Sequence, residues 1–186
     1  MVTVQDLTAF DGSRRIEVVD GEIVEHDRFA TGNMQHIFVV NRLNRMIDSF
    51  VIENQLGEAF NDGMVYVLEE HAGVVNRARI PDFSFVRAAS LPERRDILGP
   101  IRVPPTLAVE VTFPTQSVDE YLQRIRDYLD SGTEEVWFIS ARASEVHRFY
   151  RDDRSLAHIY RDGETIAAEN IFPGLEIPVS QLFDAG

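Results

Sequence analysis

Residues 80–86 read Ile-Pro-Asp-Phe-Ser-Phe-Val, and residues 107–111 read Leu-Ala-Val-Glu-Val. Both stretches are short and rich in β-branched or aromatic residues, which is typical of buried strands. Each contains one carboxylate, Asp82 in the first and Glu110 in the second. An ionised carboxylate inside a sheet is costly unless it is paired or coordinates a metal ion. These two acids are therefore the first candidates for a functional site.

Two such carboxylates on adjacent strands could converge on one cation. The chain has no cysteine, so a site built from oxygen ligands predicts Mg²⁺ or Mn²⁺. A different interpretation is that Glu110 lies on the solvent face of an edge strand and pairs with an arginine, because alternation permits an outward residue in a half-buried strand. The strand pattern by itself leaves both interpretations open.

Hairpin and helix signals flank these strands. Residues 14–27 predict a β-hairpin around Asp20-Gly21, a pair suited to positive φ angles. Thr31 or Asn33 could cap a following helix, whose apolar column includes His36.

A second helix is predicted to begin at Ser117, which forms a capping box with Glu120, and to run to about Asp130 before Gly132 stops it. Its apolar face is expected to bury Val118, Leu122, Ile125 and Leu129. The order of hairpin, helix, strands, helix and further strands predicts an α/β (α+β) fold with a mixed sheet flanked by helices. We expect one domain over residues 1–186.

The charge of the chain restricts the function. The chain has 31 acidic and 18 basic residues, a net charge of −13, spread evenly over both halves. This balance argues against non-specific phosphate binding, but it leaves open an enzyme that recruits a divalent metal. All the basic residues are arginines, which excludes Schiff-base and P-loop lysine chemistry. No stretch approaches the ~20 apolar residues of a transmembrane helix, and no signal peptide is apparent, so we expect a cytoplasmic protein with no membrane association.

The ordered series of segments resembles the PD-(D/E)XK nuclease superfamily, and more closely the Uma2 family, a bacterial group of restriction-endonuclease-like proteins. The similarity runs along the whole chain and is carried by Glu17-Val-Val-Asp-Gly-Glu-Ile23, His36 with Val39, Val40 and Leu43, Ile80–Val86, Leu107–Val111, Tyr128-Leu with Gly132, Glu135-Val-Trp-Phe-Ile139 and Phe172-Pro-Gly-Leu-Glu-Ile-Pro178.

The resemblance implies a restriction-endonuclease-like sheet and a metal-dependent nuclease acting on DNA. It implies that Asp82 and Glu110 are catalytic residues that hold Mg²⁺ or Mn²⁺, with the carbonyl of Val111 as a candidate third ligand. Glu22 and His36 also match the family and are additional candidates, with two interpretations left open beside them: a solvated hairpin carboxylate for Glu22, and a core histidine, the commoner case on an apolar helix face, for His36. Folds of this kind often dimerise to cut two strands, so a homodimer is expected.

The chain departs from the family at its lysine. The family position, four residues before Tyr128 in the second helix, holds Arg124. An arginine can bind a phosphate through two hydrogen bonds, but it cannot deliver a proton as a lysine can. Arg124 is therefore a candidate catalytic residue, and the alternative is a catalytically degenerate nuclease fold that acts as an interaction or metal-binding module. A hydrolase of a small phosphate ester is a third option.

Overall fold

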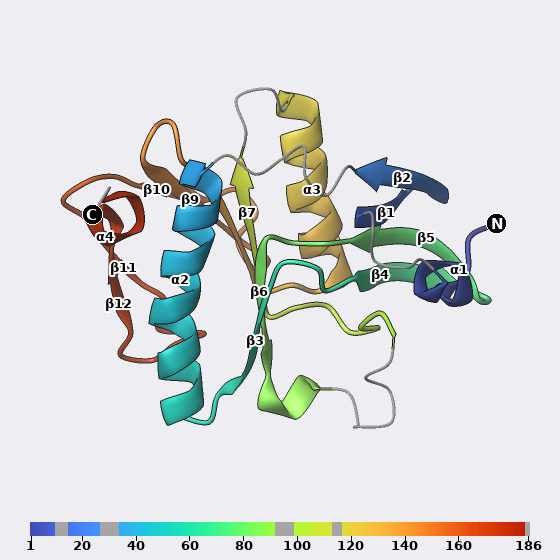
Figure 1. Ribbon diagram of the computed structural model, residues 1–186, viewed down its shortest axis with the longest axis horizontal. Helices are drawn as coiled ribbons and strands as arrows, with labels where there is room; N and C mark the ends of the chain where they lie inside the picture. Colours follow the sequence, from blue (N-terminus) through green and yellow to red (C-terminus); the bar gives the residue numbers. More distant parts are fainter. Residues whose placement is uncertain (10–14, 27–33, 92–98, 113–116, 185–186) are drawn as a thin grey trace.

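The computed structural model describes residues 1–9, 15–26, 34–91, 99–112 and 117–184. Its centre is a sheet of six strands in the spatial order β10-β9-β8-β7-β6-β3. These strands are β3 (Gly57–Asn61), β6 (Phe83–Arg87), β7 (Leu107–Thr112), β8 (Glu135–Ser140), β9 (Glu145–Tyr150) and β10 (Ala157–Tyr160). Helices α2 (Met34–Glu53) and α3 (Val118–Ser131) lie on opposite sides of this sheet (Figure 1).

The central sheet is mixed. Strands β7 and β8 are parallel and are joined through α3, whereas the other neighbouring pairs are antiparallel. The prediction of a mixed sheet flanked by helices is confirmed. A parallel pair needs a long crossover, which the capped helix supplies.

A second sheet lies beside α3 and contains the N-terminal hairpin (Figure 1). Its strands follow the order β2-β1-β5-β4 and comprise β1 (Arg15–Val19), β2 (Glu22–His26), β4 (Tyr66–His71) and β5 (Val74–Arg79). The hairpin turn has φ values of 51° at Asp20 and 77° at Gly21, as the sequence predicted. The remaining elements are α1 (Val4–Thr8), the 3-10 helix η1 (Ala88–Ser90), β11 (Thr165–Ala167), β12 (Glu176–Pro178) and α4 (Val179–Phe183).

The alternation of side chains along β7 directs Glu110 toward α3. Val109 and Val111 pack in the core that includes the buried face of α2. Ala108 packs on the other face, with Ile125 and Leu129 of α3. Because successive side chains of a strand point to opposite faces, Glu110 shares the α3 face with Ala108.

Helix α3 begins and ends as predicted, but its first turns are more exposed than expected. Ser117 and Glu120 form the capping box, and Gly132 has a left-handed φ of 110°. The predicted burial of Val118 and Leu122 is wrong, because these side chains are 71% and 41% exposed. The first turns of α3 extend past the end of β7 (Figure 1), and there it is Tyr121 that packs on β8 and β9, against Phe138 and Phe149.

The strand that contains Phe83 begins later than the sequence suggested. Residues 80–82 precede β6, which starts at Phe83. Pro81 has no N–H to donate, while the N–H of Ile80 donates to the side chain of Glu17. The predicted caps Thr31 and Asn33 lie outside the described residues.

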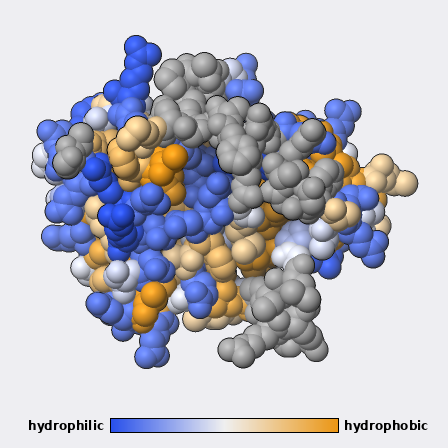
Figure 2. All heavy atoms as spheres, viewed as in Figure 1, coloured by the Kyte–Doolittle hydropathy of each residue, from blue (hydrophilic) through white to orange (hydrophobic). Residues whose placement is uncertain are grey.

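The face of the molecule in Figure 2 is mixed in polarity. Figure 2 shows hydrophilic side chains over most of the visible face, with smaller apolar patches between them. Among the described residues, no helix is both long and apolar enough to cross a membrane.

Candidate active site

Asp82 and Glu110 lie together on adjacent strands. The N–H of Val111 donates to Oδ2 of Asp82 at 2.8 Å, and the N–H of Asp82 donates to the carbonyl of Val109 at 3.0 Å. Asp82 is therefore held against β7 on both sides of Glu110. The two residues are only 4% and 7% exposed. The interpretation that Glu110 sits on the solvent face of an edge strand is wrong, since β7 has a neighbour on each side.

Two further side chains hold Asp82. Nη1 of Arg15 lies 3.3 Å from Oδ1 of Asp82, and Nε2 of His36 lies 3.2 Å from Oδ2. Burial opposes ionisation of Asp82, but His36, Arg15 and the Val111 N–H outweigh it and lower the pKa of the carboxyl below its ordinary value. The candidate His36 thus contacts Asp82 from α2.

Glu110 is bound by two residues of α3. The hydroxyl of Tyr128 donates to Oε1 of Glu110 at 2.8 Å, and Nη1 of Arg124 donates to the same oxygen at 3.1 Å. Burial raises the pKa of Glu110 to about 7, while Arg124 opposes this shift and the carboxylates of Asp82 and Glu17 add to it. The two carboxylates raise the pKa of Glu110 because the fold places them close to it.

Glu17 of β1 is a third carboxylate of the site, and it was not predicted from the sequence. Its Oε1 and Oε2 accept from Nη1 and Nη2 of Arg124 at 2.9 and 2.8 Å. It also accepts from Arg79 and from the N–H of Ile80, at 3.0 and 3.1 Å. Glu17 stands between the buried Ile16 and Val18 and is itself 1% exposed. An acid inside an apolar strand is the signal that selected Glu110, and it could have selected Glu17.

A buried ion-pair network ties Glu17 to the rest of α3. Arg79 bridges the carboxylates of Glu17 and Asp127, and its Nε donates to Asp127 at 2.8 Å. Gln123 donates to the other oxygen of Asp127 at 2.7 Å. Asp127 is 1% exposed. These ion pairs and hydrogen bonds connect the hairpin, β5 and α3 beside Arg124.

Arg124 points inward rather than along its own helix. Its nearest acidic neighbour one turn earlier, Glu120, is engaged by the backbone N–H of Ser117 in the capping box. Arg124 instead bridges Glu17 and Glu110. Burial lowers the pKa of Arg124, but these two carboxylates raise it well above its ordinary value, so its charge is permanent.

Glu22 lies apart from this cluster. It is exposed on β2, opposite Val19. Within the described part of the chain, it forms no hydrogen bond with Asp82 or Glu110.

The donor atoms near Glu110 suit a divalent cation in their chemistry. Carboxylate and carbonyl oxygens are the ligands that Mg²⁺ and Mn²⁺ prefer. Among the described residues, Glu110 is held through Oε1 alone, so its Oε2 is open. The N–H of Val111 faces Asp82, and the carbonyl of a strand residue points to the same side as its N–H.

The arrangement of the side chains is less favourable to a cation than their chemistry. No group of three or more His, Asp and Glu side chains in the described ranges is placed to hold a metal ion. Arg15 forms an ion pair with Asp82, and Arg124 forms one with Glu110. The site therefore offers two carboxylates and one backbone carbonyl as donors, with two guanidinium groups already beside them.

Comparison with known proteins places this site in a family. The family model Uma2, described as "Putative restriction endonuclease", matches residues 3–180, nearly the whole chain. The chain belongs to the Uma2 family. The match includes both acidic strands, α3 and the hairpin that carries Glu17.

The fold of this Uma2 member is also found in a solved structure. That structure is the crystal structure of a putative nuclease belonging to DUF820 from Anabaena variabilis, with a TM-score of 0.76 and 17% sequence identity. The alignment covers 98% of each chain. At this identity the likeness concerns the fold, which the two proteins share from end to end. No match was found among curated proteins.

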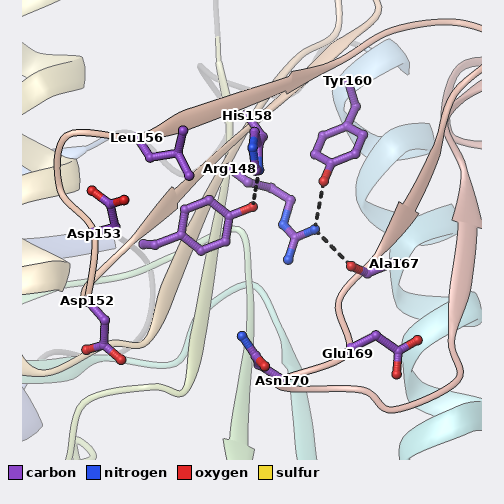
Figure 3. Close-up of a pocket in the computed structure, with 10 residues that line it drawn as sticks. Arg148, Asp152, Asp153, Leu156, His158, Tyr160, Ala167, Glu169 and Asn170 are labelled. Atoms are coloured by element: carbon purple, nitrogen blue, oxygen red, sulfur yellow. Dashed lines mark hydrogen bonds between the residues drawn. The ribbon is translucent and has the colours of Figure 1, made fainter.

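The Uma2 chain also has a separate hollow on β9 and β10, away from the acidic strands. It has a volume of about 420 Å³ and is lined by Arg148, Tyr150, His158 and Tyr160, with acidic residues at its rim. Arg148 donates to the hydroxyl of Tyr160 and to the carbonyl of Ala167 (Figure 3). Its guanidinium is also paired with the buried Glu135. None of the predicted catalytic or metal-binding residues lines this hollow.

Proposed function

We propose that this chain is a metal-dependent nuclease that hydrolyses phosphodiester bonds of DNA, with Mg²⁺ or Mn²⁺ held by Asp82, Glu110 and the carbonyl of Val111. The observation that carries the proposal is the meeting of two buried acids from adjacent strands with a guanidinium from the following helix. Family membership and fold support the nuclease class.

In this proposal, the residues around the two acids have separate roles. A bound divalent cation would act as a Lewis acid and would lower the pKa of a bound water. His36 and the Val111 N–H orient Asp82, while Tyr128 orients Glu110.

Arg124 supplies a fixed positive charge for a phosphate. A guanidinium has five N–H donors, of which Arg124 uses three on Glu17 and Glu110. Donors therefore remain for a phosphate oxygen. Arg124 acts as an electrostatic stabiliser rather than as a proton donor, because its pKa is too high.

Cleavage assays test the proposal directly. Purified protein is incubated with plasmid and with single-stranded DNA in Mg²⁺ or Mn²⁺, beside Asp82→Ala and a chelator control. We expect metal-dependent cleavage by the wild type and none by Asp82→Ala. Equal cleavage by both proteins would refute the assignment of Asp82.

Substitution of Arg124 tests its role in the same assay. Arg124→Lys restores the family residue and is expected to raise the cleavage rate, whereas Arg124→Ala is expected to lower it. Equal rates for all three proteins would show that Arg124 has no part in catalysis.

Homodimer formation and a cytoplasmic location belong to the same proposal. Two copies would place one site on each strand of a duplex. Light scattering during size-exclusion chromatography measures the mass, and a mass near twice the 21.2 kDa of one chain is expected. A mass of one chain, with and without DNA, would contradict the dimer.

A second candidate function is a non-catalytic binding module. Two observations favour it: arginines contact both candidate ligands, and the chain has no lysine. Under this alternative the protein would bind DNA or metal without cleaving any substrate. Retention of bound, intact DNA by the wild type in Mn²⁺ would support it.

A further inference from the structure

We propose that Arg15 and Arg124 are internal counter-ions of the cation site, which neutralise Asp82 and Glu110 in the metal-free protein and which a divalent cation must displace in order to bind. This inference rests on the proposed function, because it concerns the same site. It adds a competition between the chain's own arginines and the metal.

The need for positive charge comes from three buried acids. The side chains of Glu17, Asp82 and Glu110 are only 2%, 6% and 9% exposed. Carboxylates that share a poorly solvated site repel one another and favour any cation that can reach them. In this structure the guanidinium groups of Arg15 and Arg124 supply that positive charge.

Each of these arginines has at least one other partner that it holds more closely than the candidate ligand. Arg15 donates to the carbonyl of Ile80 at 2.8 Å but lies 3.3 Å from Asp82. It is also 3.3 Å from Asp62, which is half exposed.

Arg124 follows the same pattern. It is bound to Glu17 at 2.8 and 2.9 Å and to Glu110 at 3.1 Å. Both arginines can therefore release the candidate ligand and remain anchored beside it.

The buried ion pair of Arg148 and Glu135, which lies outside the site, differs in two ways. Arg148 and Glu135 form a two-oxygen pair with contacts of 2.8 and 3.0 Å, and their side chains are only 4% and 3% exposed. Arg15 and Arg124 are 14% and 15% exposed, so water and ions can reach them. Longer contacts with the candidate ligands and greater solvent access distinguish Arg15 and Arg124 from Arg148, and both features make displacement by a cation easier.

The competition predicts that removing either arginine makes cation binding tighter. The carboxylates would lose their internal partner, so the cation would gain two acids that are already in place. The metal-free protein should be less stable at the same time, since a buried acid is left uncompensated. A residue that simply ligated phosphate would show neither effect in the absence of DNA.

The experiment is Mn²⁺ titration by calorimetry, with melting temperature as a second readout, and needs no substrate. The proteins are the wild type, Arg15→Gln, Arg124→Gln and the control Arg102→Gln, whose exposed ion pair with Glu70 lies outside the site. We expect a dissociation constant roughly tenfold lower in both site variants, equivalent to about 1.4 kcal/mol, and an unchanged value in the control. If a Gln variant does not fold, Arg15→Lys and Arg124→Lys replace it, with a smaller change in the same direction.

The outcomes separate this inference from the proposed function. If the wild type binds Mn²⁺ and the folded arginine variants bind it equally or more weakly, the competition is overturned and the metal site stands. Failure of every protein to bind Mn²⁺ would overturn the metal site itself, and the competition with it. Binding that survives Asp82→Asn would place the cation elsewhere and overturn both.

Discussion

At the scale of single residues, the site is defined by acids in places that disfavour charge. Glu17, Asp82 and Glu110 each interrupt an apolar strand or its first residues, and each is nearly inaccessible to water. Every one of them is compensated by an arginine, and two of them also by backbone N–H groups. Removing one partner from such a site destabilises the protein, because the other charge stays buried without compensation.

Tyr128→Phe removes the hydroxyl that donates to Glu110. A hydrogen bond to a charged group contributes more to stability than one between neutral groups, so we expect a loss of about 2 kcal/mol. Tyr66→Phe is the matched control, because its buried hydroxyl contacts the neutral Ser84 at the same distance of 2.8 Å. We expect a smaller loss, about 1 kcal/mol, for Tyr66→Phe. Urea unfolding at a pH above the Glu110 pKa of about 7 measures both, and the reverse order would show that Tyr128 does not bind an ionised Glu110.

Glu17→Gln removes the charge between Arg79 and Arg124. The two guanidinium groups would then face each other with less compensation, and we expect a loss of about 3–5 kcal/mol in the free energy of unfolding. Glu22→Gln, on the same hairpin but exposed, should change it by no more than about 0.5 kcal/mol. Chemical denaturation of both variants checks this. Equal and small effects would mean that the Glu17 network contributes nothing in solution.

At the scale of elements, α3 shows where local signals suffice and where they fail. The capping box and the left-handed Gly132 were predicted because they depend on residues a few positions apart. The predicted burial of Val118 and Leu122 was wrong, because periodicity does not say that Tyr121, rather than these two residues, faces β8 and β9. Strand β5 was missed, since its sequence VVNRAR carries three polar residues whose partners lie elsewhere in the chain.

Alanine substitution along α3 measures that boundary. Ile125→Ala should cost about 2–5 kcal/mol, because Ile125 is 6% exposed in the core with Ala108 and Phe138. Leu122→Ala, one turn earlier and 41% exposed, should cost less than about 1 kcal/mol. Thermal or urea unfolding of the two variants gives the comparison. A cost at Leu122 as large as that at Ile125 would show that this turn is covered in solution.

At the scale of the whole molecule, the net charge of −13 acts against compactness. Raising the NaCl concentration from about 0.01 M to about 0.1 M shortens the Debye length from about 30 to 10 Å and screens this repulsion. We therefore expect the melting temperature to rise by a few degrees, while the buried Arg79–Asp127 pair is little affected. Scanning calorimetry at several salt concentrations tests this. A fall in melting temperature would show that exposed pairs such as Arg102–Glu70 outweigh the repulsion.

The sequence by itself determined the mixed sheet with its flanking helices, the hairpin turn, the ends of α3 and the family. It also selected Asp82 and Glu110, because a carboxylate in an apolar strand is a local anomaly that needs no knowledge of its neighbours. Only the tertiary structure decided that Glu17 joins them, that Arg15 and Arg124 are their partners, and that Glu22 is not. The physical reason is that alternation and periodicity specify which face of an element is buried. Which of the 18 arginines meets which of the 31 acids depends on how distant elements pack.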